Sequence, residues 1–195
     1  MGIVATPGTG AFMPSHLVTH RGGAPSPWLP HSYEVISNRQ DNADTHTIAI
    51  RPVTGVPMAQ PEPGQFMMLY AFGIGEAPIS LSGIASDHLV HTIRKVGAVS
   101  AALATLSPGQ QVGLRGPFGK PWPAEAAEGK DVILMAGGLG IAPLQPLIEH
   151  FLSHKTPHQT VHLLYGARDE AGLIYEHEVD RWSKGLHLLR TVDSA

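Results

Sequence analysis

The sequence lacks cysteine, is poor in aromatic residues and has no long hydrophobic run. Without cysteine, the 195-residue chain holds no disulfide and no thiolate-ligated zinc or iron–sulfur site. No apolar stretch approaches the roughly 20 residues that span a bilayer, and the amino-terminal residues lack a basic segment followed by an apolar core. We therefore expect a cytoplasmic protein without membrane insertion.

Charge of either sign is also scarce. Thirteen basic and 16 acidic residues give a formal net charge of −3, so no basic excess indicates a nucleic-acid partner. The chain has instead 22 glycines, 17 prolines and 43% hydrophobic residues. This composition is typical of a folded protein with many turns.

The first part of the sequence predicts a leader and a small β-barrel. Residues 1–30 are rich in Gly, Pro, Ser, Thr and His without a sustained period, which predicts a poorly ordered leader. Short β-prone runs separated by turn residues then predict strands over 33–37, 45–52, 65–70, 79–84, 89–96 and 111–115. Residues 100–106 predict one helix. Six strands at this spacing favour an antiparallel barrel domain over residues 31–124.

The second part of the sequence predicts an α/β domain over residues 130–195. Continuous apolar runs of the kind found in parallel sheets alternate with helical segments. The predicted strands cover 131–136, 161–165 and 186–192, and the predicted helices cover 142–154 and 175–182. Because three strands make half of a doubly wound sheet, we expect the sequence to be a fragment or to depend on a further segment.

A glycine-rich turn, AGGLGIAPL, follows the first strand of this second domain. Gly138 and Gly140 allow a tight turn and a close approach to a ligand, and a helix beginning near Ala142 directs its positive end at the same space. Pro143 replaces the third glycine of the usual fingerprint and suits the first turn of a helix. The pattern predicts a pyrophosphate site; the alternative is an ordinary strand-to-helix turn.

A second anion site is predicted before the helix of the first domain. Gly97 supplies a flexible residue and Ser100 a potential hydroxyl cap, next to backbone N–H groups that can receive an anion.

Histidines recur at positions 150, 154, 158 and 162, but we predict no metal site. Pro157 breaks the helix before the third of them, so His150 and His154 alone can share a helical face. Catalytic zinc usually needs three protein ligands. Solvated surface histidines explain this pattern more simply.

Five segments in a fixed order resemble the ferredoxin-NADP reductase superfamily: PGQFMMLY, APISLSG, RGPFG, AGGLGIAPL and LLYGARDEAGLIYEHEVDRW. The likeness runs from about His31 to the end and is greatest to flavin subunits of the hydrogenase gamma, anaerobic sulfite reductase B and dihydroorotate dehydrogenase electron-transfer types. It implies a small antiparallel FAD-binding barrel followed by a partial doubly wound parallel-sheet domain that binds NAD(P)H. The flavin ring would lie between the two domains.

The resemblance also assigns the flavin contacts. It implies that the hydroxyl or backbone of Ser80 approaches flavin N5, as the catalytic position, and that Ile79 packs against the ring. Ala77 stands where these proteins carry an arginine that pairs with the flavin pyrophosphate, and Arg94 or Lys95 is a candidate to supply that charge. Taken alone, Ser80 reads as a strand hydroxyl and Arg94 as a solvated cation. The other implied flavin contacts are Pro78, Thr92, Ile93, Gly97, Val99 and Ser100.

For the nucleotide, the resemblance points to the glycine turn and to the end of the next strand. Arg168 is suited to a 2′-phosphate, whereas Asp169 and Glu170 would repel one, so we favour NAD slightly over NADP. The implied nucleotide contacts are Gly137, Gly138, Leu139, Gly140, Ile141, Ala142, Pro143, Gly166 and Arg168.

These features imply an FAD-dependent diaphorase module that carries electrons between NAD(P)H and an iron–sulfur or hydrogenase-type partner subunit. A [2Fe–2S] cluster is expected only if a cysteine-bearing segment follows Ala195. One alternative is a stand-alone flavin or ferredoxin reductase. Another is a noncatalytic, truncated binding module.

Overall fold

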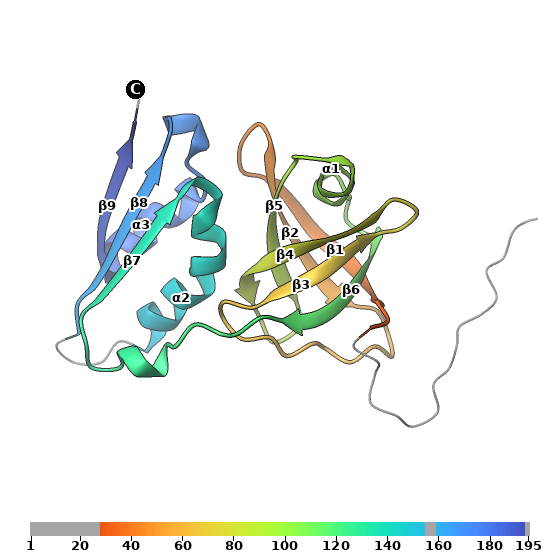
Figure 1. The fold of residues 1–195 in the computed structure, drawn as a ribbon, viewed down its shortest axis with the longest axis horizontal. Helices are drawn as coiled ribbons and strands as arrows, with labels where there is room; N and C mark the ends of the chain where they lie inside the picture. The colour runs from red at the N-terminus through yellow and green to blue at the C-terminus, as the bar shows by residue number, and fades with distance from the viewer. Residues whose placement is uncertain (1–27, 155–158, 194–195) are drawn as a thin grey trace, which may run out of the picture.

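The computed structural model describes residues 28–154 and 159–193 and arranges them as a closed six-stranded antiparallel barrel followed by a three-stranded parallel sheet (Figure 1). Except for residues 28–30, the predicted leader lies outside the described residues. Within the described ranges, no helix is both long enough and apolar enough to cross a membrane.

The barrel closes in the order β1-β2-β5-β4-β3-β6, with every neighbouring pair antiparallel. Alternate side chains point inward, so that residues such as Val35, Ile50 and Leu81 are fully buried. The helix α1 (Ala98–Ala104) packs against β3 and β5 and buries Leu103 in the same core. The strands are β1 (His31–Gln40), β2 (Thr45–Pro52), β3 (Phe66–Ala71), β4 (Gly75–Ile84), β5 (Leu89–Arg94) and β6 (Gln111–Phe118).

The start of α1 corrects the sequence prediction by two residues. The helix begins at Ala98, with Gly97 as its N-cap, and Ser100 is its third residue. The Ser100 hydroxyl accepts hydrogen bonds from the N–H groups of Val96 and Gly97, both at 3.0 Å. Ser100 therefore caps the helix from inside its first turn, which the residue types alone do not distinguish from an N-cap serine.

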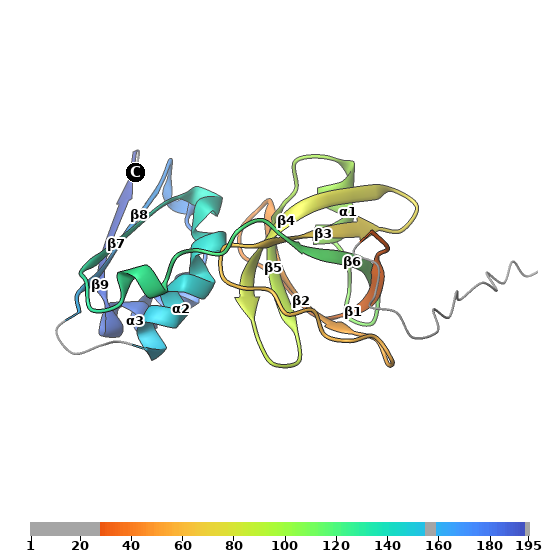
Figure 2. The ribbon, with the colours of Figure 1, turned by 60° about the horizontal axis from the view of Figure 1, so that its bottom comes forward.

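In the second domain, β7 (Val132–Gly137), β8 (Val161–Ala167) and β9 (His187–Val192) form a parallel sheet in that order. The helices α2 (Gln145–Ser153) and α3 (Glu176–Gly185) lie on one side of it (Figure 2). They bury a core that includes Leu163 and Trp182. The opposite face leaves Ile133, Met135 and Leu189 more than half exposed.

Short 3-10 turns complete this domain: η1 (Glu125–Ala127), η2 (Gly138–Leu144) and η3 (Glu170–Gly172). The turn η2 occupies the place where an α-helix was predicted to begin, because α2 starts only at Gln145. An α-helix from Ala142 would place Pro146 where its missing N–H should bond the Ala142 carbonyl and where its ring would clash with it. Starting at Gln145 puts Pro146 in the first turn, which needs no such bond.

The barrel and the sheet touch through η2 and α2, which pack against β4. The segment between the domains also contributes, since the Trp122 indole N–H donates to the carbonyl of Pro143 at 3.1 Å. The glycine turn is therefore held directly against the barrel.

Candidate functional site

A cavity of about 710 Å³ lies where the barrel meets η2. Strands β4 and β5, the start of α1 and the turn η2 form its walls. The residues predicted to contact the flavin all line this cavity: Pro78, Ile79, Ser80, Thr92, Ile93, Arg94, Gly97, Val99 and Ser100. Its volume falls in the range of about 300–1,000 Å³ that is usual for small-molecule and cofactor sites.

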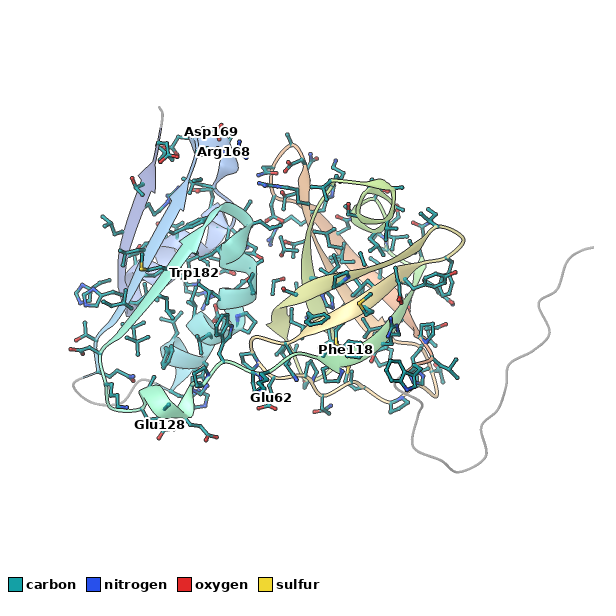
Figure 3. All side chains as sticks on the ribbon, in the orientation of Figure 1. Glu62, Phe118, Glu128, Arg168, Asp169 and Trp182 are labelled. Carbon is teal, nitrogen blue, oxygen red and sulfur yellow. The ribbon has the colours of Figure 1, made fainter. Side chains whose placement is uncertain are left out.

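A second cavity, of about 740 Å³, lies at the carboxyl ends of the parallel strands. Figure 3 labels Arg168 and Asp169 at this end of β8. Predicted nucleotide contacts that line it are Gly137, Gly138, Leu139, Gly140, Gly166 and Arg168. Ala142 and Pro143 line the first cavity instead. Ile141 lines neither cavity, because its side chain is fully buried in the core of the sheet domain.

Arg94 lines both cavities, as do Leu139 and Gly140. The Arg94 Nε atom lies 3.3 Å from Asp44 Oδ2, in the turn between β1 and β2. Arg94, rather than Lys95, is thus the cation placed at both sites. Sequence reasoning missed Asn42 and Asp44 in the second cavity, since this segment reads as an ordinary polar turn.

Ser80 lies on β4 where that strand forms the edge of the first cavity. The strand pairs with β3 along residues 75–80, from Ala71↔Gly75 to Phe66↔Ser80, and with β5 only from Leu81 onward. The other edge of residues 75–80 is therefore open toward the cavity. Ser80 itself is half-buried.

The comparisons agree with this geometry. The sequence profile of the oxidoreductase NAD-binding domain matches residues 134–194. A probable dihydroorotate dehydrogenase B (NAD(+)) electron transfer subunit from Methanopyrus kandleri is 38% identical over 120 residues, which cover 62% of this chain and 44% of that protein. Sulfhydrogenase 2 subunit gamma from Pyrococcus furiosus is 32% identical over 130 residues, covering 66% and 43% respectively. The chain thus spans less than half the length of these curated relatives.

Among solved structures, the Amycolatopsis cytochrome P450 reductase GcoB superposes with a TM-score of 0.71 and 25% identity, over 86% of this chain and 52% of that one. Phthalate dioxygenase reductase superposes with a TM-score of 0.70 and 19% identity, over 82% and 51%, and supports the fold. The chain thus resembles reductases of the ferredoxin-NADP reductase type in sequence and fold. The predicted fold class is confirmed with it.

A buried hydroxyl cluster joins the two domains. The Thr92 hydroxyl contacts those of Thr47 at 2.8 Å, Ser82 at 2.9 Å and Tyr175 at 2.5 Å. Tyr175 precedes α3 and adopts a left-handed backbone, with φ of 64°. Burial raises the pKa of its hydroxyl to about 12, so the group stays protonated near neutral pH. Nothing in the local sequence signals a contact across 83 positions.

The cluster limits which predicted hydroxyls can face a ligand. One hydroxyl offers one donor and two acceptor sites, so three partners saturate Thr92. Ser100 is saturated as well, because it accepts two N–H groups and donates to the Gly97 carbonyl. The Ser80 hydroxyl, in contrast, has no hydrogen-bond partner within the described part of the chain. Ser80 is therefore the predicted hydroxyl that is available to the first cavity.

Tyr175→Phe is expected to lower the free energy of unfolding by about 1–2 kcal/mol, because it leaves the buried Thr92 hydroxyl one partner short. Denaturant unfolding followed by circular dichroism measures this change. Tyr70→Phe on β3 is the matched control, because Tyr70 contributes no hydroxyl to the cluster. A Tyr175→Phe variant as stable as the parent protein would contradict the role given to the cluster.

The rings of His150 and His154 stack at 4.8 Å, and His158 lies outside the described residues. Among the residues that the structure describes, no three His, Asp or Glu side chains gather as a metal site would require.

Proposed function

We propose that the chain is an FAD-dependent oxidoreductase module that carries electrons between NAD(P)H and an iron–sulfur or hydrogenase-type partner subunit. The observation that carries this proposal is that two cavities of ligand size meet at Arg94, Leu139 and Gly140. Ligands in the two cavities would touch at this junction. Two relatives, an electron transfer subunit and a sulfhydrogenase gamma subunit, support the partner class.

The residues of the first cavity fit a flavin. Apolar side chains, among them Ile79, Val99 and Pro143, offer surfaces for a flat aromatic ring, and the Ser80 hydroxyl offers a polar contact at its edge. Arg94 is the cation among the described lining residues and would pair with the diphosphate, in the absence of an arginine at Ala77. A bound flavin supplies the exchange between hydride and single-electron transfer.

The second cavity suits the diphosphate of a nicotinamide nucleotide. A Cβ atom at Gly137, Gly138 or Gly140 would meet no atom within 4 Å, so the backbone there borders open space. Gly138 has a φ of 49°, which favours glycine. Bare backbone at the carboxyl ends of parallel strands lets phosphate oxygens approach N–H groups closely. The chain's own residues thus bind and orient the nucleotide, and no side-chain acid or base is required.

Under this proposal, residues 31–124 form the FAD domain and residues 130–195 the nucleotide domain of a cytoplasmic electron-transfer unit. Purified chain titrated with FAD should turn yellow and quench flavin fluorescence, and NADH should then bleach the bound flavin. A colourless protein that takes up no added FAD would support the noncatalytic module instead. Co-purification with iron–sulfur subunits separates a complex component from a stand-alone reductase.

The carboxylates at the second cavity predict a preference for NADH over NADPH. Asp44, Asp169 and Asp193 line it, against Arg94 and Arg168. Asp169 is oriented by its bond to the Gly172 N–H at 2.8 Å. A 2′-phosphate would therefore meet like charge.

Asp193→Asn should tighten NADPH binding about fivefold, since it removes about 1 kcal/mol of repulsion, and should change NADH affinity less. Fluorescence titration at low salt measures both dissociation constants, and the difference should shrink in high salt. Asp180→Asn on α3, outside the cavity lining, is the matched control. Equal gains for the two nucleotides would count against this electrostatic explanation.

A further inference from the structure

His91 is a fully buried histidine on β5 that the proposed function does not use. Its Nδ1 atom lies 3.1 Å from the carbonyl oxygen of Ser80. Since a carbonyl only accepts, the ring N–H at Nδ1 donates this bond. Burial lowers the pKa of the ring to about 4, so the imidazole is neutral near neutral pH, with a bare Nε2.

This bond lies at the point where β4 separates from β5. The two strands pair at Ile84↔Leu89, at Gly83↔Val90 and, across a bulge, at Leu81↔His91. The Leu81 N–H donates to the Gln65 carbonyl on the β3 side. Because backbone groups alternate along a strand, those of Ser80 face the opposite edge, toward β5 and the first cavity. The His91 ring N–H thus donates to the Ser80 carbonyl at the point where the hydrogen-bonded pairing of β4 with β5 ends.

Core packing alone does not account for a histidine here. The Nε2 atom is buried and has no hydrogen-bond partner among the described residues. Leucine would fill a comparable volume without an unpaired buried nitrogen. The feature that histidine adds at this position is the Nδ1–H donor aimed at Ser80.

We propose that His91 is a positioning residue of the flavin site: by holding the Ser80 carbonyl, it fixes the peptide that carries Ser80 at the open edge of β4. This inference rests on the proposed function, since it assumes that a flavin occupies the first cavity. His91 does not reach the cavity itself, because it is absent from the described lining residues, and it acts through Ser80.

His91→Leu and His91→Asn separate the donor from the packing. The asparagine amide can place an N–H near the position of Nδ1, whereas leucine cannot donate. We expect His91→Leu to weaken FAD binding about tenfold, the equivalent of one lost hydrogen bond, and to shift the visible spectrum of the bound flavin. His91→Asn should keep the FAD affinity and the flavin spectrum of the parent protein. His88→Leu, which removes an imidazole just before the same strand, should bind FAD as the parent protein does.

The measurements are FAD titration by fluorescence quenching, the visible spectrum, and thermal unfolding of the flavin-free protein. Failure of the parent protein to bind FAD would overturn the proposed function. Tight binding by the parent and equally tight binding by a folded His91→Leu variant would overturn this inference alone. If His91→Leu does not fold, His91→Asn is compared with His91→Gln, whose amide mimics Nε2. Tighter binding by the asparagine variant supports the inference, and equal binding overturns it.

Discussion

Gly140→Val is expected to weaken NADH binding by about tenfold or more while leaving thermal unfolding unchanged. Gly140 lines both cavities, and its φ lies outside the left-handed region that disfavours side chains. A Cβ there meets no protein atom within 4 Å, so a valine occupies cavity space without straining the fold. The space it takes is the space in which the diphosphate would approach the backbone. Fluorescence titration with NADH and a thermal melt measure the two effects.

Gly140→Ala provides a graded control, because one methyl group removes less of that space and should cost less affinity. Because Gly140 also borders the first cavity, FAD affinity is measured in parallel, and we expect it to fall less than NADH affinity. A valine variant with unchanged NADH affinity would refute the assignment of the second cavity. A variant that loses affinity only because it unfolds is recognised by its melt.

The second large effect is expected at Trp182. Its side chain is fully buried beneath the sheet, and its indole N–H donates to Glu149 at 3.3 Å. The ring of Tyr175 meets it edge-on, with centroids 6.1 Å apart. Trp182→Ala should therefore lower the free energy of unfolding by about 3–5 kcal/mol, through lost packing and the cavity left behind.

Denaturant unfolding at constant temperature measures this loss, and Trp122 provides the matched control. Trp122 is 41% exposed, so Trp122→Ala should cost clearly less. Trp182→Phe keeps an aromatic ring, so its loss of unfolding free energy should lie between those of Trp182→Ala and Trp122→Ala. A Trp182→Ala variant within about 1 kcal/mol of the parent would show that the core of the sheet domain reorganises around the gap.

The secondary structure was predictable because local patterns determine it. Alternation of apolar residues indicated the barrel strands, and continuous apolar runs indicated β7 and β8. The errors concern the bounds of elements: β1 and β4 extend beyond the predicted 33–37 and 79–84, and two helix starts were misplaced. At α2, the sequence interpretation used Pro143 and overlooked that Pro146 must also lie in a first turn. At α1, Ser100 could cap the helix either as its N-cap or as its third residue, and the residue types do not distinguish the two.

The candidate site was predictable where motifs are contiguous and was missed where the domains meet. The resemblance located the residues around Ser80 and Gly140 that line the two cavities. Asp44 and Asp193 reach the second cavity only because turn and strand ends converge there, and Tyr175 reaches Thr92 only after the domains pack together. These contacts depend on tertiary docking, which no local pattern encodes.

The contact between Tyr175 and Thr92 has a consequence for how the molecule melts. A side chain anchored beside Trp182 in one domain completes the hydrogen bonding of a buried group in the other. Separating the domains would break this hydrogen bond and the packing of η2 and α2 against β4, so we expect the two halves to unfold together. Calorimetry of the parent protein should accordingly record a single endotherm, with matching calorimetric and van't Hoff enthalpies.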